Sequence, residues 1–300
     1  MKYLRRIATI LWRILKWTAA AILTLLALIL LFYTSQAVQR PARRAVNTEI
    51  ADGITYSRHV WNEPHRAVVH LIELDLTVDG IEIFTTPPDQ PGDFDHLLAR
   101  TTTQFAEEYD APIVVNASFF FPIDYTVTDF YPQVGEPVSS VGLTISEGAM
   151  FSPEDDDGFH TLCILPTHVE IRQSGCSAET VEAVSGSPIF LFEGEPNRDI
   201  WEFETRAYPR SAVGIDATGR RVWLLVADGQ QPGYSRGVTF AQMADFMLEL
   251  GAVSAINLDG GGSATMAIGG VLTSAPIQNQ VPMRQRPVAN HLGVKYGVSE

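Results

Sequence analysis

The sequence predicts a mixed α+β fold, in which a central mixed sheet with packed helices and antiparallel hairpins follows one N-terminal transmembrane helix. Three observations support this prediction. Short apolar runs that alternate with polar residues recur along the chain, as they do in strands. A segment with a helical apolar stripe lies between two such runs in the last third of the chain. Near the start, 23 uncharged residues separate Lys16 from Arg40, which is enough to span a bilayer.

The first 44 residues direct the chain to a membrane, because they hold eight basic residues and no acidic one. Five of the basic residues precede the apolar segment, and the positive-inside rule therefore places the N-terminus in the cytoplasm. We expect a basic tail and anchor over residues 1–37, contact with the bilayer through residues 17–39, and a single-pass protein of the cell membrane. The alternative is a cleaved signal peptide, because Ser35-Gln36-Ala37 is a small-x-small site. Either way, the rest of the chain is exported.

The exported part is strongly acidic. From residue 45 onward the chain has 13 basic and 35 acidic residues, a net charge of −22. Such a body repels the phosphate backbone of nucleic acids, so we expect no nucleic-acid partner. An anionic substrate must instead meet a local arginine or a group of backbone amides.

The two cysteines agree with export. Cys163 and Cys176 flank an alternating stretch that predicts a strand. A disulfide between them fits an oxidising compartment, and the alternative is a pair of half-buried free thiols.

The order of elements divides the exported part into a tether and one domain. Residues 38–66 are polar and contain two prolines, which predicts a tether, and residues 67–300 form the predicted catalytic domain. Strands over 67–76 and 81–84 are predicted to pair as a hairpin across Asp79-Gly80. Further elements are a helix within 96–109, a buried strand over 112–115 that ends at Asn116, a long aromatic-rich loop over 119–140 that faces substrate, and strands near 162–165, 168–173, 188–192, 211–216 and 221–227.

The last third of the chain carries the functional argument. The strand 221–227 ends at Asp228, a capping box at Thr239 starts a helix that Gly251 stops, and a second strand then ends at Asp259. If both strands share a sheet, the connection is a right-handed parallel crossover, and both carboxylates emerge at the same edge. Adjacent or next-nearest strands would place these groups roughly 5–9 Å apart, the separation that glycoside hydrolases use. Asn116 follows its own strand in the same way; the alternative is that all three are ordinary turn residues.

Two further features can hold an anion. Asp259 is followed by Gly260, Gly261, Gly262 and Ser263, and consecutive glycines allow backbone amides to approach a ligand closely. The alternative is a tight turn between strands. Arg210 begins an apolar strand, where its planar guanidinium could clamp a phosphate; the alternative is a surface ion pair.

These motifs resemble those of the phosphodiester glycosidases. The resemblance covers most of residues 67–296 and is weak between 121 and 185. One departure is Ala117, where the family usually has glycine. The matching segments are Asn116-Ala-Ser-Phe-Phe120, Pro209-Arg-Ser-Ala-Val-Gly214, Asp228-Gly-Gln230, Met243-Ala-Asp-Phe-Met-Leu248, Asn257-Leu-Asp-Gly-Gly-Gly-Ser-Ala-Thr265 and Arg286-Pro-Val-Ala-Asn-His-Leu-Gly-Val294.

The resemblance implies an exported, membrane-anchored hydrolase that cleaves a sugar-1-phosphodiester, such as an N-acetylglucosamine-1-phospho-sugar or an envelope glycan, at the glycosidic C–O bond. Our hypothesis for this chemistry gives Asp259 the role of nucleophile or water-activating base and Asp228 that of partner carboxylate, with the two roles open to exchange. Arg210 and the loop Gly260–Ser263 would hold the phosphate, and Asn116 would hydrogen-bond sugar or phosphate. No cofactor is required for this chemistry, and a divalent cation stays open.

Two other classes of function stay open. A metal-dependent phosphodiesterase could use Asp228, Asp259 and Asn116 as oxygen ligands, although the seven histidines are scattered. A non-catalytic envelope module could instead bind sugar-phosphate polymers.

Overall fold

An eight-stranded antiparallel sheet lies at the centre of the structure, a computed structural model that describes residues 2–89, 97–123, 131–153, 158–200 and 205–297. Its strands follow the order β1-β2-β3-β17-β16-β18-β14-β15. Their bounds are β1 Val46–Ala51, β2 Ile54–Trp61, β3 Ala67–Asp75, β14 Ile189–Phe192, β15 Glu195–Pro196, β16 Arg210–Ile215, β17 Arg221–Asp228 and β18 Ser254–Asn257.

Two five-stranded antiparallel sheets form the next layer. The first has the order β20-β19-β6-β23-β4 and the second the order β10-β9-β13-β11-β12. Their bounds are β4 Glu82–Thr85, β6 Ile113–Asn116, β9 Thr144–Ser146, β10 Ala149–Ser152, β11 His160–Ile164, β12 Val169–Arg172, β13 Glu182–Gly186, β19 Met266–Ile268, β20 Val271–Leu272 and β23 His291–Lys295. Smaller elements are β5 Leu97–Leu98, β7 Phe120–Pro122 and β8 Pro137–Ser140 in one sheet, the hairpin β21 Ile277–Gln278 with β22 Val281–Pro282, and the 3-10 turn η1 Gly261–Ser263.

Capping boxes start the helices α2 (Thr102–Glu108) and α4 (Phe240–Leu250). Thr101 caps α2 and Thr239 caps α4, each with a glutamine three residues later that bonds back to the cap. Gly251 ends α4 in the left-handed conformation, with φ of 94°.

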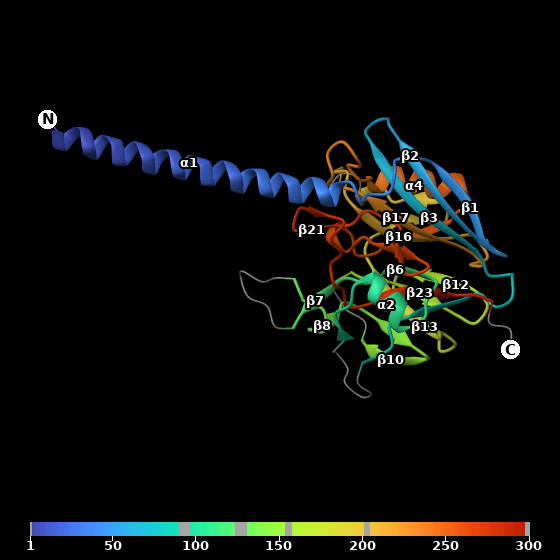
Figure 1. The fold of residues 1–300 in the computed structure, drawn as a ribbon. Helices are drawn as coiled ribbons and strands as arrows, with labels where there is room; N and C mark the ends of the chain where they lie inside the picture. The colour runs from blue at the N-terminus through green and yellow to red at the C-terminus, as the bar shows by residue number, and fades with distance from the viewer. Residues whose placement is uncertain (1, 90–96, 124–130, 154–157, 201–204, 298–300) are drawn as a thin grey trace.

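The N-terminal helix α1 (Lys2–Ala37) projects from the body as a long rod (Figure 1). Its segment Arg5–Ala37 contains an 18-residue stretch with a mean hydropathy of 2.3 and none of it buried, so by length and composition the helix is able to cross a membrane. A signal sequence near the N-terminus passes the same test.

Apolar side chains fill three layers between these elements. The largest cluster lies between the eight-stranded sheet and the two five-stranded sheets and includes Ile72, Val115 and Ile256. The second lies between the other face of the eight-stranded sheet and α4. The third packs α2 through Phe105 against the far face of the β6 sheet. The predicted mixed α+β class is thus confirmed, and every strand pairing within the described residues is antiparallel.

Two predicted elements are wrong. Within the expected tether 38–66, β1 and β2 join the central sheet, and β2 pairs with β3 along its whole length. Both strands have few fully buried positions, so their sequence is as polar as that of a linker. The expected hairpin across Asp79-Gly80 is also absent, because β4 leaves β3 and pairs with β23 in the second layer.

Two other predictions are confirmed. Strands β17 and β18 both run antiparallel to β16, which lies between them, so they run parallel to each other with α4 as the crossover. Cys163 and Cys176 form a disulfide, with Cα atoms 5.8 Å apart, which joins β11 to the loop after β12. The expected substrate-facing loop 119–140 contains the strands β7 and β8, and its residues 124–130 lie outside the described part of the chain.

Candidate functional site

The centre of the candidate site is the loop that follows β18, which begins with Asp259. The Asp259 side chain is half-buried beside the Ser263 hydroxyl, the Arg286 guanidinium and the Gly260 amide. Burial raises the pKa of the Asp259 carboxyl to about 6, although these three neighbours each act to lower it. A carboxyl group that titrates near pH 6 can exchange a proton under physiological conditions.

Asn116 fixes the backbone of this loop from the neighbouring sheet. Its side chain is fully buried at the end of β6. The amide Nδ2 donates to the Asp259 carbonyl (2.6 Å), and Oδ1 accepts from the Ser211 hydroxyl (2.7 Å) and the Thr265 amide (3.1 Å). The Asp259 amide donates in turn to the Ala117 carbonyl (2.9 Å). Asn116 therefore ties together β6, β16 and both ends of the loop.

The three glycines permit close approach of protein groups. A side chain at Gly260 would meet the Pro209 carbonyl at 2.7 Å, and one at Gly262 would overlap the Arg286 guanidinium. Gly261 has a φ of 62° and lies against the Tyr208 ring. Two amides of the loop are also used internally, since Gly261 donates to Pro209 (2.8 Å) and Ser263 to Gly260 (3.1 Å). The loop is thus packed tightly by its own neighbours.

Asp228 lies at the same edge of the sheet, at the end of β17, but in a buried network of its own. Its residue exposure is only 2%. Oδ1 accepts from the Ala275 amide (2.7 Å), and Oδ2 accepts from His70 Nε2 (2.9 Å) and the Tyr234 hydroxyl (3.2 Å). All of these donors belong to the protein, so the carboxylate holds Ala275 and the loop after β17 against β3.

The network continues away from Asp228 through His70. With Nε2 of His70 donating to the ionised carboxylate, Nδ1 of a neutral ring accepts from the Tyr56 hydroxyl (2.9 Å). Tyr56 accepts in turn from Arg58 Nε (3.2 Å). A chain of polar groups therefore runs from the exposed side of β2 to the buried carboxylate.

Arg210 lies on the opposite face of the sheet from Asp228. Side chains alternate along a strand, so Ser211 points to the layer that holds Asn116, while Arg210 points to the α4 side. Its guanidinium lies 4.0 Å from the Phe240 ring centroid and 5.7 Å from that of Tyr208. Arg210 is 8% exposed.

The structure thus brings together Asn116, Asp259 and the loop Gly260–Ser263. Asp228 and Arg210 share the same edge but point to different layers. The roles predicted for these residues in substrate binding stay predictions.

Arg286 belongs to this site and had no assigned role in the sequence. Its Nη1 donates to the Ser263 hydroxyl (3.1 Å), its Nε donates to Gln278 Oε1 (2.8 Å), and its guanidinium lies 4.0 Å from the Tyr131 ring centroid. The signal was present, since Arg286 opens the final motif of the family resemblance. The contact between Arg286 and the loop after β18 is long-range, and spacing in the sequence does not predict such a contact.

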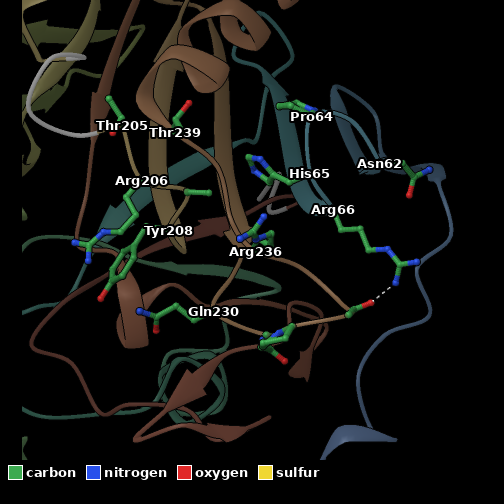
Figure 2. A pocket seen from close by; sticks show the side chains of 14 residues that line it. Asn62, Pro64, His65, Arg66, Thr205, Arg206, Tyr208, Gln230, Arg236 and Thr239 are labelled. Atoms are coloured by element: carbon green, nitrogen blue, oxygen red, sulfur yellow. Dashed lines mark hydrogen bonds between the residues drawn. The ribbon is translucent and has the colours of Figure 1, made fainter.

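Beside this site lies a cleft of about 840 Å³, which we call the basic cleft. Figure 2 shows the side chains that line it, among them Arg66, Arg206, Arg236 and His65. Tyr208 belongs both to the wall of the cleft and to the packing of Gly261. The basic cleft and the Asp259 loop are therefore neighbours that share one aromatic ring.

Among the described residues, no group of three or more His, Cys, Asp or Glu side chains is placed to hold a metal ion.

Curated relatives match a short part of this chain. N-acetylglucosamine-1-phosphodiester alpha-N-acetylglucosaminidases of Bos taurus and Homo sapiens are 51% and 49% identical to this chain over 67 residues, which is 22% of this chain and 12% of each relative. The chain thus matches only about an eighth of the length of these curated relatives.

Two solved structures share the fold. The catalytic domain of the zebrafish N-acetylglucosamine-1-phosphodiester alpha-N-acetylglucosaminidase has a TM-score of 0.58 at 21% identity, with 83% of each chain covered. A hypothetical protein from Synechocystis has a TM-score of 0.54 at 15% identity, with 85% of this chain and 64% of that chain covered. The family model described as phosphodiester glycosidase matches residues 109–295, more than half of the sequence and all of the Asp259 loop, and the chain therefore belongs to the phosphodiester glycosidase family.

Proposed function

We propose that this protein hydrolyses a sugar-1-phosphodiester at the glycosidic C–O bond, with Asp259 as the reacting carboxylate. The observation that carries the proposal is the environment of Asp259. It is half-buried, has a pKa raised to about 6, and lies against a hydroxyl and a guanidinium in a loop whose backbone Asn116 holds in place. The names of the curated relatives, which act on an N-acetylglucosamine-1-phosphodiester, support this substrate class.

In the proposed reaction the ionised Asp259 either takes a proton from the water that attacks the anomeric carbon, or attacks this carbon itself and forms a glycosyl ester that water then hydrolyses. The bond between this carbon and the bridging oxygen breaks, and the electron pair leaves with the phosphate monoester. A phosphate monoester is a good leaving group, so the reaction depends less on a strong general acid than an ordinary glycoside does. The main requirement is stabilisation of the oxocarbenium-like carbon and the departing negative charge.

Arg286 is placed to serve the second requirement. Its guanidinium bonds Ser263 and lies beside Asp259, so a phosphate that entered there would meet a planar cation and a hydroxyl. Arg210 stays the other candidate for the phosphate, from the α4 side of the sheet. The contacts of Asn116 and Asp228 with protein donors and acceptors favour positioning roles for both, with Asn116 holding the loop and Asp228 the segment around Ala275.

We further propose that α1 anchors the protein in the cell membrane with its N-terminus in the cytoplasm. The eight basic residues in the first 44 and the apolar span support this orientation. The catalytic domain then meets its substrates, including envelope glycans or exopolysaccharides that carry sugar phosphates, outside the cytoplasm.

The test is hydrolysis of a panel of sugar-1-phosphodiesters by the full chain in neutral detergent, run in oxygen-18 water with and without EDTA. Label in the sugar and indifference to EDTA are the expected results. The Asp259→Asn protein should lose turnover, while Asp245→Asn, an exposed carboxylate on α4, should keep it.

Label in the phosphate together with loss of activity in EDTA would replace the proposal by a metal-dependent phosphodiesterase. Saturable binding of a sugar-phosphate polymer without turnover, unchanged by Asp259→Asn, would replace it by a non-catalytic binding module.

A further inference from the structure

The basic cleft differs in charge from the rest of the exported body. That body has 13 basic and 35 acidic residues, and three of its 12 arginines line this one cleft. None of the described residues that line the cleft is acidic. A phosphorylated molecule is repelled by most of the surface but finds a local positive field here.

The arginines in the cleft have no neighbouring carboxylate to neutralise them among the described residues. Arg66, Arg206 and Arg236 are exposed, and within the described part of the chain no carboxylate lies within 4.0 Å of their guanidinium nitrogens. In Figure 2, Arg206 lies beside Tyr208, Arg236 and His65 lie in the centre, and Arg66 lies on the far side. Guanidinium groups bind phosphate oxygens through two parallel hydrogen bonds, so this arrangement suits a phosphate rather than a neutral sugar.

Two hydrogen bonds to backbone carbonyls keep the cleft in shape. Arg66 Nη1 donates to the Gly233 carbonyl (2.7 Å), and the Arg236 amide donates to the Arg66 carbonyl (2.8 Å). These bonds join the loop after β17 to the segment before β3. Gln230, in the same loop, has a φ of 54°, which is uncommon for a residue other than glycine and clusters at functional sites.

The position of the cleft relates it to the Asp259 loop. Tyr208 packs on Gly261 with one part of its ring and lines the cleft as well. On the other strand, Asp228 is followed after one glycine by Gln230, which also lines the cleft. The cleft and the Asp259 loop therefore lie on either side of the Tyr208 ring.

We propose that the basic cleft binds a second phosphate of the substrate, carried on the aglycone beyond the scissile phosphodiester. Arg206 and Arg236 hold this phosphate, and Arg66 and His65 complete the positive field. The inference rests on the proposed function, because it names a subsite of that same substrate. The substrate class becomes a glycosyl phosphodiester whose leaving part is itself phosphorylated.

The first experiment measures binding without turnover, with inorganic phosphate as the probe and the full chain in neutral detergent at low salt. The double variant Arg206→Gln/Arg236→Gln should weaken phosphate binding by about tenfold or more, because two charge-assisted contacts are lost. Arg220→Gln removes an exposed arginine outside the cleft and should leave the dissociation constant unchanged. Equal binding by the wild type and the double variant overturns the proposal.

The second experiment compares two diesters of N-acetylglucosamine 1-phosphate that differ only in their aglycone, glycerol or glycerol phosphate. The wild type should show a kcat/KM for the phosphorylated aglycone at least about tenfold higher, and the double variant should bring the ratio near one. High salt should reduce the ratio of the wild type as well. A ratio that the double variant does not change overturns the proposal.

The two experiments separate the subsite from the reaction. Phosphate binding that depends on Arg206 and Arg236, without turnover of either diester, supports an anion site here and contradicts the proposed hydrolysis. If both diesters are turned over at equal rates and phosphate binding is unchanged in the double variant, the result supports the hydrolysis and contradicts the subsite.

Discussion

At the scale of single residues, the pKa of Asp259 decides how activity responds to pH. As nucleophile or base, Asp259 must be ionised, so kcat/KM should rise with pH through a midpoint near 6 and then reach a plateau. A pH–rate profile of the full chain on a sugar-1-phosphodiester measures this. Activity that falls as pH rises through 6 would instead make Asp259 a proton donor.

The same carboxyl group lowers stability at neutral pH. Its folded pKa lies above the usual value of 3.8, so the folded state disfavours the ionised form, and stability is lost as pH rises from about 4 to 6. Asp259→Asn should therefore increase the free energy of unfolding at pH 7 by roughly 1–3 kcal/mol, which raises the Tm. At pH 4 the substitution should have little effect. Thermal unfolding at both pH values checks this, with Asp245→Asn as the exposed control. Equal effects at the two pH values would contradict the shifted pKa.

Arg286 gives a second prediction at this scale. Its positive charge lowers the pKa of Asp259, so Arg286→Gln should move the midpoint of the pH–rate profile to higher pH, besides reducing kcat/KM. Arg284→Gln, an exposed arginine two residues away, should move neither. An unchanged midpoint in Arg286→Gln would show that this guanidinium does not act on Asp259.

At the scale of elements, the join between the two sheet layers depends on Asn116. Asn116→Ala removes three buried hydrogen bonds that connect β6, β16 and the Asp259 loop, and it should lower the free energy of unfolding by about 2–4 kcal/mol. Activity should also fall, because the Asp259 loop loses the hydrogen bonds with Asn116 that fix its backbone. Denaturant unfolding against Asn47→Ala, an exposed residue on β1, separates this effect from a general one. A loss below 1 kcal/mol would mean that the loop keeps its shape without this side chain.

An element can be predicted from the sequence when the interactions that form it are local along the chain. The capping box at Thr239 and the alternation of 221–227 are local, so the strand–helix–strand unit was predictable, including the shared edge of Asp228 and Asp259. The position of Asn116 opposite β16 depends on the stacking of two sheets, which local patterns do not encode. The sequence of β1 and β2 instead predicts a tether, because strands with few buried positions lack the apolar alternation on which strand prediction depends.

At the scale of the whole molecule, His291 makes the fold sensitive to acid. Its ring is buried, stacks on Phe105 with centroids 4.6 Å apart, and has no hydrogen-bond partner for either nitrogen among the described residues. Burial, with a smaller contribution from the Arg100 charge, lowers its pKa to about 3. The folded state therefore disfavours the protonated ring, and stability is lost as pH falls below about 6.5.

His291→Phe keeps an aromatic ring at this position and removes the titration. The fall in Tm between pH 7 and pH 4.5 should be smaller in this variant than in the wild type, while His168→Gln, a partly exposed histidine, should behave like the wild type. The comparison must be between proteins at each pH, because Glu182, whose pKa burial raises to about 7, changes stability in the opposite direction. An identical fall in wild type and His291→Phe would assign the acid sensitivity to other groups.

The link between α1 and the body sets how far the enzyme can reach. Arg58 Nη1 donates to the Ala42 carbonyl (2.9 Å), and Arg43 donates to the Trp61 carbonyl (2.8 Å), so the chain is held to the body from Ala42 onward, only five residues after α1 ends at Ala37. Five residues span at most about 18 Å. With α1 in a bilayer, the body would stay within a thin layer above the lipid headgroups. Encounters with substrate would then depend on lateral diffusion in two dimensions.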